Sequence, residues 1–305
     1  MSQSEEFKSH DATRQGFIPL VGLYGGPGTG KTFSALLLAR GLAGKERVTL
    51  IDTEERRGEI YAKDIPGGYR AIRFLPPFSP KRYAQAIQSA IDEGAKVVVV
   101  DSLSHCWEGE GGVCDMAAAN EAKSGKTGLH NWNAPKVEHR KLLQFLLRST
   151  VPIICCIRGK NKTRIGRDTH GKQTIRKDEF VSPITEADFA FELTVNAEVR
   201  TDHSVNLTKC CTPDLRACFP TEGPITIQHG EKIAAWCQAG GQPVKQSAKS
   251  AKARFWEMTS KIHGGDKSKL QTYLHTNGFV DEKIALESLT ESDFENLCLL
   301  AEKFV

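Results

Sequence analysis

Residues 25–32 read Gly-Gly-Pro-Gly-Thr-Gly-Lys-Thr and match the pattern G-x-x-x-x-G-K-[ST] at every fixed position. Glycines let backbone N–H groups surround phosphate oxygens, and the N-terminus of a following helix adds positive potential. In such a loop the lysine reaches the β- and γ-phosphates of a nucleotide, and the last hydroxyl binds Mg²⁺. The pattern predicts ATP and Mg²⁺ as ligands. The predicted nucleotide-binding residues are Gly25, Gly26, Pro27, Gly28, Thr29, Gly30, Lys31, Thr32 and Phe33.

The residues on both sides of this loop predict the elements that it needs. An apolar run over 20–24 is typical of a strand, and residues 32–42 are typical of a helix that Gly44 ends. A glycine-rich turn that matches the pattern by chance is not expected to have both flanks. We therefore predict that Lys31 acts on the phosphates, in binding and in catalysis.

Two carboxylates follow apolar runs and are candidates for the chemistry. Asp101 ends the run Val97–Val100, and with Thr32 it is the predicted Mg²⁺ ligand. Glu54 follows the predicted strand 47–52, and we predict that it activates the attacking water. The alternative roles are a helix-capping aspartate and a glutamate that stabilises a helix N-terminus. Ser102 follows Asp101, so the Asp-Glu pair found in many P-loop ATPases is absent.

Apolar strands alternate with helical segments over the first 160 residues, which predicts an α/β fold with a mostly parallel sheet. Because the carboxyl ends of parallel strands share one edge of a sheet, the loop, Glu54 and Asp101 are expected to meet there. Residues 107–131 are polar and glycine-rich, and we expect a long surface excursion. The remaining predicted elements are strands at 69–75, 151–157, 189–195 and 205–209 and helices at 55–63, 79–93, 135–149 and 230–238.

A basic segment follows the strand predicted at 151–157. Residues 158–177 hold eight basic side chains against the single acid Asp168, and the sequence around Gly171 favours a hairpin turn. Clustered Lys and Arg residues are typical of surfaces that follow nucleic-acid phosphates. The alternatives are a solvated basic loop, or one that serves the nucleotide of a neighbouring subunit. The candidate nucleic-acid residues are Lys160, Lys162, Arg164, Arg167, Lys172 and Arg176.

The composition is that of an ordinary globular protein. The 305 residues are 39% hydrophobic and 26% charged, with a net charge of +4. The nine cysteines include no C-x-x-C pattern, so we expect neither zinc nor a disulfide framework, and we expect Cys155 and Cys156 in the core. With no signal-peptide pattern and no membrane-length apolar run, the predicted location is the cytoplasm, with no membrane partner.

The chain is expected to divide into four parts. These are a flexible arm at 1–16, a nucleotide-binding domain at 17–238, a linker at 239–252 rich in Gly, Gln, Ser and Lys, and a small helical bundle at 253–305.

Two short motifs resemble those of a known family. Residues 51–54, Ile-Asp-Thr-Glu, resemble the I-D-[TA]-E segment of RecA/RadA-type recombinases, and residues 100–102, Val-Asp-Ser, are similar to the end of their Walker B strand. Over 17–240, including Pro-Ile-Thr-Glu-Ala-Asp-Phe at 183–189, the chain most resembles the phage-encoded RecA-like AAA ATPases, some of which anneal single strands.

The resemblance implies a RecA-like core and roles for several residues. The glutamate at the position of Glu54 activates water in that family, and two loops in the places of 107–131 and 159–178 contact single-stranded DNA. A polar residue, often glutamine, senses the γ-phosphate in that family. Here Arg158 stands near that position, which is a departure from the pattern. The family also implies oligomers or filaments, with a basic residue from a neighbour, for which Arg158 and Lys160 are candidates.

The predicted function is ATP-dependent DNA binding in phage-type homologous recombination, by annealing or strand pairing, in a bacterial host cytoplasm. The C-terminal bundle is a candidate site for a single-strand-binding protein. The alternatives are a helicase loader or protein-remodelling ATPase, an ATP-gated DNA-binding module with negligible turnover, and a small-molecule kinase. Ser102 argues against the loader, and the basic segment against the kinase.

Overall fold

The computed structural model describes residues 12–167, 173–186 and 188–239, and in the C-terminal part 251–260, 264–281 and short pieces between 284 and 297. For residues 162–167 and 173–180 it describes the backbone alone. Contacts divide the chain into two compact units, one over Arg14–Gly240 and the other including Gly241–Val305. Most of the predicted arm 1–16 and of the predicted linker 239–252 lies outside the described residues.

The larger unit is built on a sheet whose strands follow the order β3-β2-β4-β5-β1-β7-β8, with β6 paired to β5. Neighbouring strands from β3 to β7 are parallel, whereas β6 and β8 each run antiparallel to the strand before them. The predicted mostly parallel α/β fold is confirmed. The strands are β1 Leu20–Gly25, β2 Val48–Asp52, β3 Arg70–Arg73, β4 Val97–Asp101, β5 Ile153–Arg167, β6 Gln173–Pro183, β7 Val195–Val199 and β8 Val205–Cys210.

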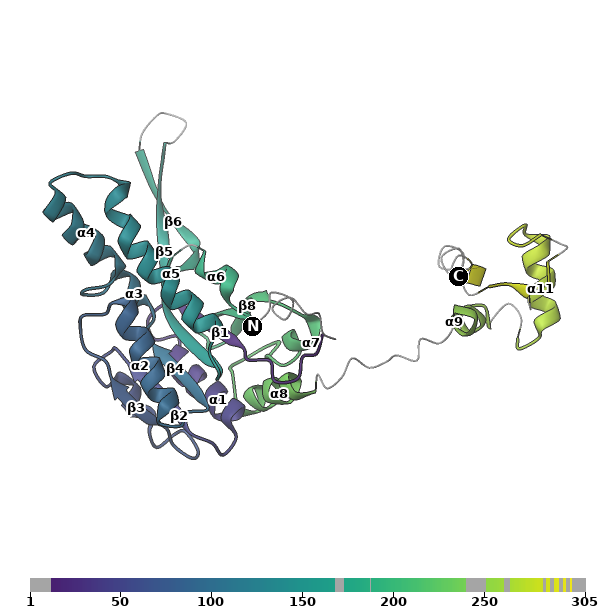
Figure 1. Cartoon of the computed structure of the whole chain (residues 1–305), viewed down its shortest axis with the longest axis horizontal. Helices are drawn as coiled ribbons and strands as arrows, with labels where there is room; N and C mark the ends of the chain where they lie inside the picture. Colours follow the sequence, from purple (N-terminus) through teal and green to yellow (C-terminus); the bar gives the residue numbers. More distant parts are fainter. Residues whose placement is uncertain are drawn as a thin grey trace, which may run out of the picture. The chain divides into compact units, whose positions relative to one another are not determined.

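Helices cover both faces of this sheet (Figure 1). Helices α2 and α5 pack together on one face, and α1 and α8 pack together on the other. The helices of this unit are α1 Lys31–Ala43, α2 Pro80–Asp92, α3 Ser104–Glu108, α4 Val113–Ser124, α5 Asn133–Leu147, α6 Phe189–Glu192, α7 Pro213–Arg216 and α8 Ile227–Gln238, with 3₁₀ helices η1 Arg57–Tyr61 and η2 Leu129–Trp132.

The valine run of β4 contributes to two hydrophobic cores. Val97 and Val99 belong to the core beneath α1, whereas Val98 and Val100 belong to the core beneath α2 and α5. Successive side chains of a strand point to opposite faces, so a strand covered on both sides is apolar throughout. The same alternation places Cys156 in the first core and Cys155 in the second, and both are fully buried as predicted.

Helices α1 and α8 cross at two glycines. A Cβ atom on Gly41 would lie 2.0 Å from the carbonyl oxygen of Ile227 and 2.7 Å from the Cα of Gly230, and one on Gly230 would lie 2.2 Å from the carbonyl oxygen of Leu38. The two backbones therefore approach more closely than any side chain allows. This contact fixes α1, whose N-terminus follows the glycine loop, against the second helix of the layer.

Four sequence predictions need correction. Residues 189–192 form α6 and not a strand, because their N–H groups bond locally, as from Phe191 to the Asp188 carbonyl at 3.0 Å, and the strand starts only at Val195. Residues 107–131, expected as an irregular excursion, contain α4 and η2. The helix predicted at 55–63 is the shorter 3₁₀ helix η1. The strand predicted at 151–157 extends to Arg167, and with β6 it forms a hairpin that projects beyond the helical layers (Figure 1).

The second unit is a small helical bundle. Its described helices are α9 Ala251–Met258 and α11 Lys267–Thr276, and the Asp266 carboxylate caps α11 by accepting the Ser268 N–H at 2.9 Å. Its core consists of Phe255, Leu270, Leu274, Phe294 and Leu297.

Candidate functional site

The glycine loop connects the end of β1 to the start of α1. Gly28 and Gly30 have φ angles of 74° and 86°, which residues with a Cβ rarely adopt. A Cβ on Gly25 would lie 2.3 Å from the carbonyl oxygen of Val199, so this position also requires glycine. The Thr29 hydroxyl donates to the Gly26 carbonyl at 3.1 Å and closes the loop. Three of its glycines are therefore required by backbone geometry.

Lys31 and Thr32 begin α1, beside the loop. The Lys31 Nζ donates to the Gly26 carbonyl oxygen at 2.7 Å, which places the ammonium group over the loop. The Thr32 hydroxyl donates to the Asp101 Oδ2 at 2.5 Å. A helix N-terminus, an ammonium group and backbone N–H groups thus converge on one place, which is the environment that a polyphosphate needs.

Asp101 lies at the end of β4, next to the end of β2. Burial raises the pKa of the Asp101 carboxyl to about 6; the Thr32 hydrogen bond lowers it, and the charges of Glu54 and Asp52 raise it further. A buried carboxylate close to other acids gains from a nearby cation. The Thr32 hydroxyl and Asp101 carboxylate are hard oxygen donors of the kind that Mg²⁺ prefers, so the residues fit the predicted Mg²⁺ role.

Glu54 is placed by the residue that ends β2. One Asp52 carboxylate oxygen accepts the Glu54 N–H at 2.6 Å, and the other accepts the Gly58 N–H at 3.0 Å. Glu55 and Arg56 lie between them with positive φ angles of 53° and 73°. Asp52 thereby fixes a tight turn that carries Glu54 into the site, a role that the sequence analysis missed. The pattern of an aspartate directly before a turn is a known signal for this bonding.

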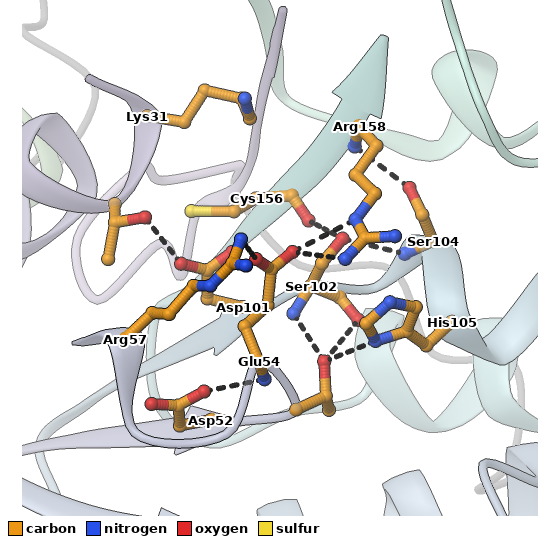
Figure 2. A network of polar contacts seen from close by, with 12 residues as sticks. Lys31, Asp52, Glu54, Arg57, Asp101, Ser102, Ser104, His105, Cys156 and Arg158 are labelled. Atoms are coloured by element: carbon orange, nitrogen blue, oxygen red, sulfur yellow. Dashed lines mark hydrogen bonds and ion pairs between the residues drawn. The ribbon is translucent and has the colours of Figure 1, made fainter. Parts of the chain in front are cut away.

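Arg158 contacts Glu54 directly. Its Nε and Nη2 atoms both lie 2.9 Å from the Glu54 Oε1, and the Arg57 Nη1 lies 3.5 Å from the Oε2 (Figure 2). The Ser104 hydroxyl accepts the Arg158 N–H at 2.8 Å and ties the end of this part of β5 to α3. The residue predicted as a phosphate sensor is therefore paired with the residue predicted to activate water.

A polar network lies behind Glu54. The Thr53 hydroxyl oxygen accepts the Ser102 N–H at 2.7 Å and lies 2.8 Å from the His105 Nδ1 (Figure 2). The Tyr83 hydroxyl donates to the Ser102 carbonyl at 2.8 Å. Burial lowers the pKa of His105, and the charge of Arg158 lowers it further, so this imidazole is neutral at pH 7. The network connects the ends of β2 and β4 and holds both acids in place.

The glycine loop, Thr32, Glu54, Asp101 and Arg158 line a cleft of about 1010 Å³. Its charged end holds Lys31, Glu54, Asp101 and Arg158. The lining also includes Tyr61 and Phe33, whose ring centroids lie 5.3 Å apart. Such a surface suits a flat base, and Phe33 was predicted as a binding residue whereas Tyr61 was not. The cleft residues that the sequence analysis missed include Leu37, Arg57, Tyr61, Asp202, His203 and Ile225.

His203 reaches the glycine loop from the turn between β7 and β8. Its Nδ1 lies 3.0 Å from the Thr29 carbonyl oxygen, and its own φ angle is 64°. The chain from Arg200 to Ser204 is a tight turn, in which the His203 N–H donates to the Arg200 carbonyl at 2.9 Å. No local motif marks this histidine, because only the pairing of β7 with β1 brings the turn beside the loop.

The basic hairpin follows Arg158 and Gly159, the β5 residues that line the cleft. Lys160 is exposed and lies 3.9 Å from Glu108, which lines the cleft. In the strand pairing, Arg164 stands opposite Arg176 and Arg167 opposite Gln173. Lys162 also lies in β5, and Lys172 lies outside the described residues. The antiparallel pairing of β5 with β6 confirms the two strands of the hairpin, and the residues expected to form its turn lie outside the described residues.

Two tryptophans flank the segment 107–131. Trp107 and Trp132 are half-buried with ring centroids 6.2 Å apart, and Trp107 packs edge-on against His139. Across the described part of the chain, no three His, Cys, Asp or Glu side chains are arranged to hold a metal ion. Among the same described residues, no helix is both long and apolar enough to cross a membrane.

Comparison with known protein families gives a match to this chain. A family model described as "AAA domain" matches residues 19–210, which include the glycine loop, Glu54, Asp101 and Arg158. No curated protein matches the sequence. Because the match covers more than half of the chain and agrees with the geometry of the cleft, the protein belongs to the AAA-type P-loop ATPase family.

Proposed function

We propose that this protein binds and hydrolyses ATP and binds single-stranded DNA in phage-type homologous recombination, by annealing or strand pairing. The observation that carries the proposal is the contact between Glu54 in the nucleotide cleft and Arg158 at the base of the basic hairpin. The predicted water-activating group and the predicted DNA-binding element are thus joined by one ion pair. A DNA-dependent ATPase needs such a connection.

The residues of the cleft suggest how hydrolysis proceeds. The glycine loop and Lys31 hold the phosphates of ATP, and Lys31 offsets the charge that builds on them as the terminal P–O bond breaks. Glu54 accepts a proton from a water molecule while the oxygen of that water attacks the γ-phosphorus. The products are ADP and inorganic phosphate. Thr32 and Asp101 would hold Mg²⁺, which supplies further charge neutralisation at the phosphates.

The hairpin provides the proposed DNA surface. Residues at directly opposite positions of an antiparallel pair are close neighbours, and like charges there are unfavourable. Arg164 and Arg176 occupy such positions, and the register shifts between Asn161 and Thr163. A polyanion such as a nucleic-acid strand neutralises like charges at opposite positions. The basic residues proposed for contact are Lys160, Lys162, Arg164, Arg167, Lys172 and Arg176.

Other parts of the proposal concern partners and place. We expect the protein to act in the cytoplasm of a bacterial host as an oligomer or filament, with the C-terminal bundle binding a single-strand-binding protein. Of the two candidates for a residue that acts on a neighbour's nucleotide, Arg158 contacts Glu54 of its own chain. Lys160, which is exposed, is the better candidate for the neighbour.

A second candidate function is an ATP-gated DNA-binding module with negligible turnover. The same contact favours it, because a carboxylate that accepts hydrogen bonds from Arg158 is a poor base for water. The two functions differ in a Glu54→Gln variant. A gated module keeps full annealing without hydrolysis, whereas a turnover-dependent recombinase loses both.

The proposal is tested by measuring ATP hydrolysis with and without single-stranded DNA. The test variant changes Arg164, Arg167 and Lys172 to Ala. The control changes Lys45, Lys81 and Lys96, which are exposed and lie outside both segments predicted to contact DNA, to Ala and alters the charge equally. We expect DNA to stimulate the wild type and the control but not the test variant. For the test variant, the slope of the logarithm of the DNA-binding constant against the logarithm of the salt concentration should become less negative by about 2. Hydrolysis indifferent to DNA in all three proteins would instead favour a protein-remodelling ATPase.

A further inference from the structure

A second cavity lies beside the nucleotide cleft and shares three side chains with it. Its volume is about 420 Å³, and Glu54, Arg57 and Arg158 line both spaces. Ion pairs join these three side chains, with Arg158 at 2.9 Å and Arg57 at 3.5 Å from the Glu54 carboxylate. The ion-paired group is therefore the wall between the two cavities.

The remaining walls come from residues that do not line the nucleotide cleft. Phe78 and His105 stack with ring centroids 5.0 Å apart and planes at 26°. Leu75 stands at the rim with 58% of its surface exposed. The residues that line this cavity but not the nucleotide cleft are Thr53, Glu55, Leu75, Pro76, Phe78 and His105.

Arg158 is the group in this cavity that can hold an anion, since the two arginines and two glutamates of the lining balance in charge. Two guanidinium groups face the single Glu54 carboxylate, and the uncharged His105 adds no further charge. Glu55 opposes an anion, but Glu55 and the Arg57 side chain are both exposed, so water and salt screen both charges and Arg158 is the main anion partner. A guanidinium group presents parallel donors that match the oxygens of a phosphate as well as those of a carboxylate. A phosphate group can therefore replace Glu54 as the partner of Arg158.

We propose that the second cavity binds a phosphate group, either a phosphodiester of a nucleic-acid strand or inorganic phosphate, and that this binding draws Arg158 away from Glu54. The inference rests on the proposed function, because its consequence is a Glu54 carboxylate that is free to accept a proton from water. The position of Arg158 in β5 adds to it. That strand continues into the basic hairpin, so Arg158 belongs both to the strand of the proposed DNA surface and to the lining of this cavity.

Binding is tested with Lys31→Ala in every protein, which weakens phosphate binding by the glycine loop. The probes are radiolabelled orthophosphate and a short oligothymidylate, each measured by equilibrium dialysis. Leu75→Asp adds a negative charge at the exposed rim, and Leu75→Asn is the matched neutral control. We expect the aspartate to weaken binding about fivefold relative to the asparagine, which corresponds to about 1 kcal/mol. Glu55→Gln should tighten binding two- to threefold.

The two probes separate the sources of the phosphate. An effect on the oligonucleotide alone identifies nucleic acid as the ligand, and an effect on orthophosphate identifies the free ion. Equal binding of both probes by Leu75→Asp and Leu75→Asn overturns the proposal, as does weaker binding by Glu55→Gln. This assay contains no ATP, so its outcome is independent of whether the protein hydrolyses ATP.

Turnover provides the second readout, in proteins with Lys31 intact. We expect Leu75→Asp and Leu75→Asn to hydrolyse ATP at the wild-type rate when no second ligand is present. With the ligand, Leu75→Asp should require about five times more of it for half-maximal stimulation. Equal stimulation of both variants contradicts the coupling to Glu54. Absence of hydrolysis in the wild type contradicts the proposed function, and the binding assay then decides the site alone.

Discussion

The Glu54 Oε1 accepts a hydrogen bond from the Arg158 Nε at 2.9 Å and forms an ion pair with the Nη2 at 2.9 Å. The two residues are 104 positions apart in the sequence. They meet because β2 and β5 lie on either side of β4, whose own end carries Asp101. The ends of β2 and β4 and the middle of β5 thus bring the predicted base, the predicted Mg²⁺ ligand and an arginine into one cleft.

Glu54→Gln should separate binding from hydrolysis. The amide cannot accept the proton of the attacking water, so we expect kcat to fall by about 10²- to 10⁴-fold. ATP should bind as tightly or more tightly, because a negative charge near the phosphates is removed. Single-turnover hydrolysis and titration with a fluorescent ATP analogue measure the two effects. Glu59→Gln, a carboxylate in η1 that pairs with Arg56 and Arg73, is the control and should keep the wild-type rate. A Glu54→Gln variant with the wild-type rate would assign the base to another residue.

Asp101→Asn should stabilise the ligand-free protein while it removes Mg²⁺-dependent activity. The pKa of Asp101 is raised by burial to about 6, so the folded state binds its proton more tightly than the unfolded state. The contribution of this group to stability is therefore greatest below about pH 4 and declines as the pH rises to about 6. Asparagine does not titrate, so we expect the free energy of unfolding of the Asp101→Asn variant to exceed that of the wild type by about 1–3 kcal/mol at pH 7.

Thermal unfolding at pH 4 and at pH 7 tests this prediction, since the advantage of asparagine should grow with pH. Nucleotide binding in Mg²⁺ should strengthen over the same interval in the wild type, as Asp101 ionises, and should stay weak in the variant. A stability difference that is independent of pH would mean that the proton of Asp101 is not linked to folding.

Tyr61→Ala should weaken the binding of ATP but not that of a polyphosphate. Tyr61 and Phe33 form a pair of rings in the cleft lining, against which a base can pack. Loss of such a contact costs about 1–1.5 kcal/mol, so the Kd for ATP should rise about tenfold. Inorganic tripolyphosphate has no base and should bind equally to both proteins. Tyr61→Phe keeps the ring and should resemble the wild type, and an equal loss for both ligands would mean that Tyr61 acts on the glycine loop instead.

Gly41→Ala should destabilise the larger unit. In an open helix this change stabilises by up to about 1 kcal/mol. Here the new Cβ would lie 2.0 Å from the carbonyl oxygen of Ile227, and moving two packed backbones apart costs more, so we expect a net loss of about 1–3 kcal/mol. Denaturant unfolding measures the loss. Gly230→Ala meets the same crossing, so the double variant should lose less than the sum of the two single changes. Additive losses would mean that the two sites relax independently.

Local sequence alone determined the chemical parts of this protein. The glycine loop, the two carboxylates after apolar runs and the alternation of strands and helices were predicted, because each depends on residues adjacent in the chain. The valines of β4 illustrate this, since a continuous apolar run predicts a strand buried on both faces and the structure places those valines in two cores.

Tertiary structure decided how these parts work on one another. The partner of Glu54, the position of His203 beside Thr29, and the apolar surface that includes Tyr61 all depend on which strands are neighbours. Strand order is set by packing over the whole sheet, and no short motif encodes it. Tertiary context also explains the error at residues 189–192, where a segment with the composition of a strand forms local turn hydrogen bonds and joins the sheet only at Val195.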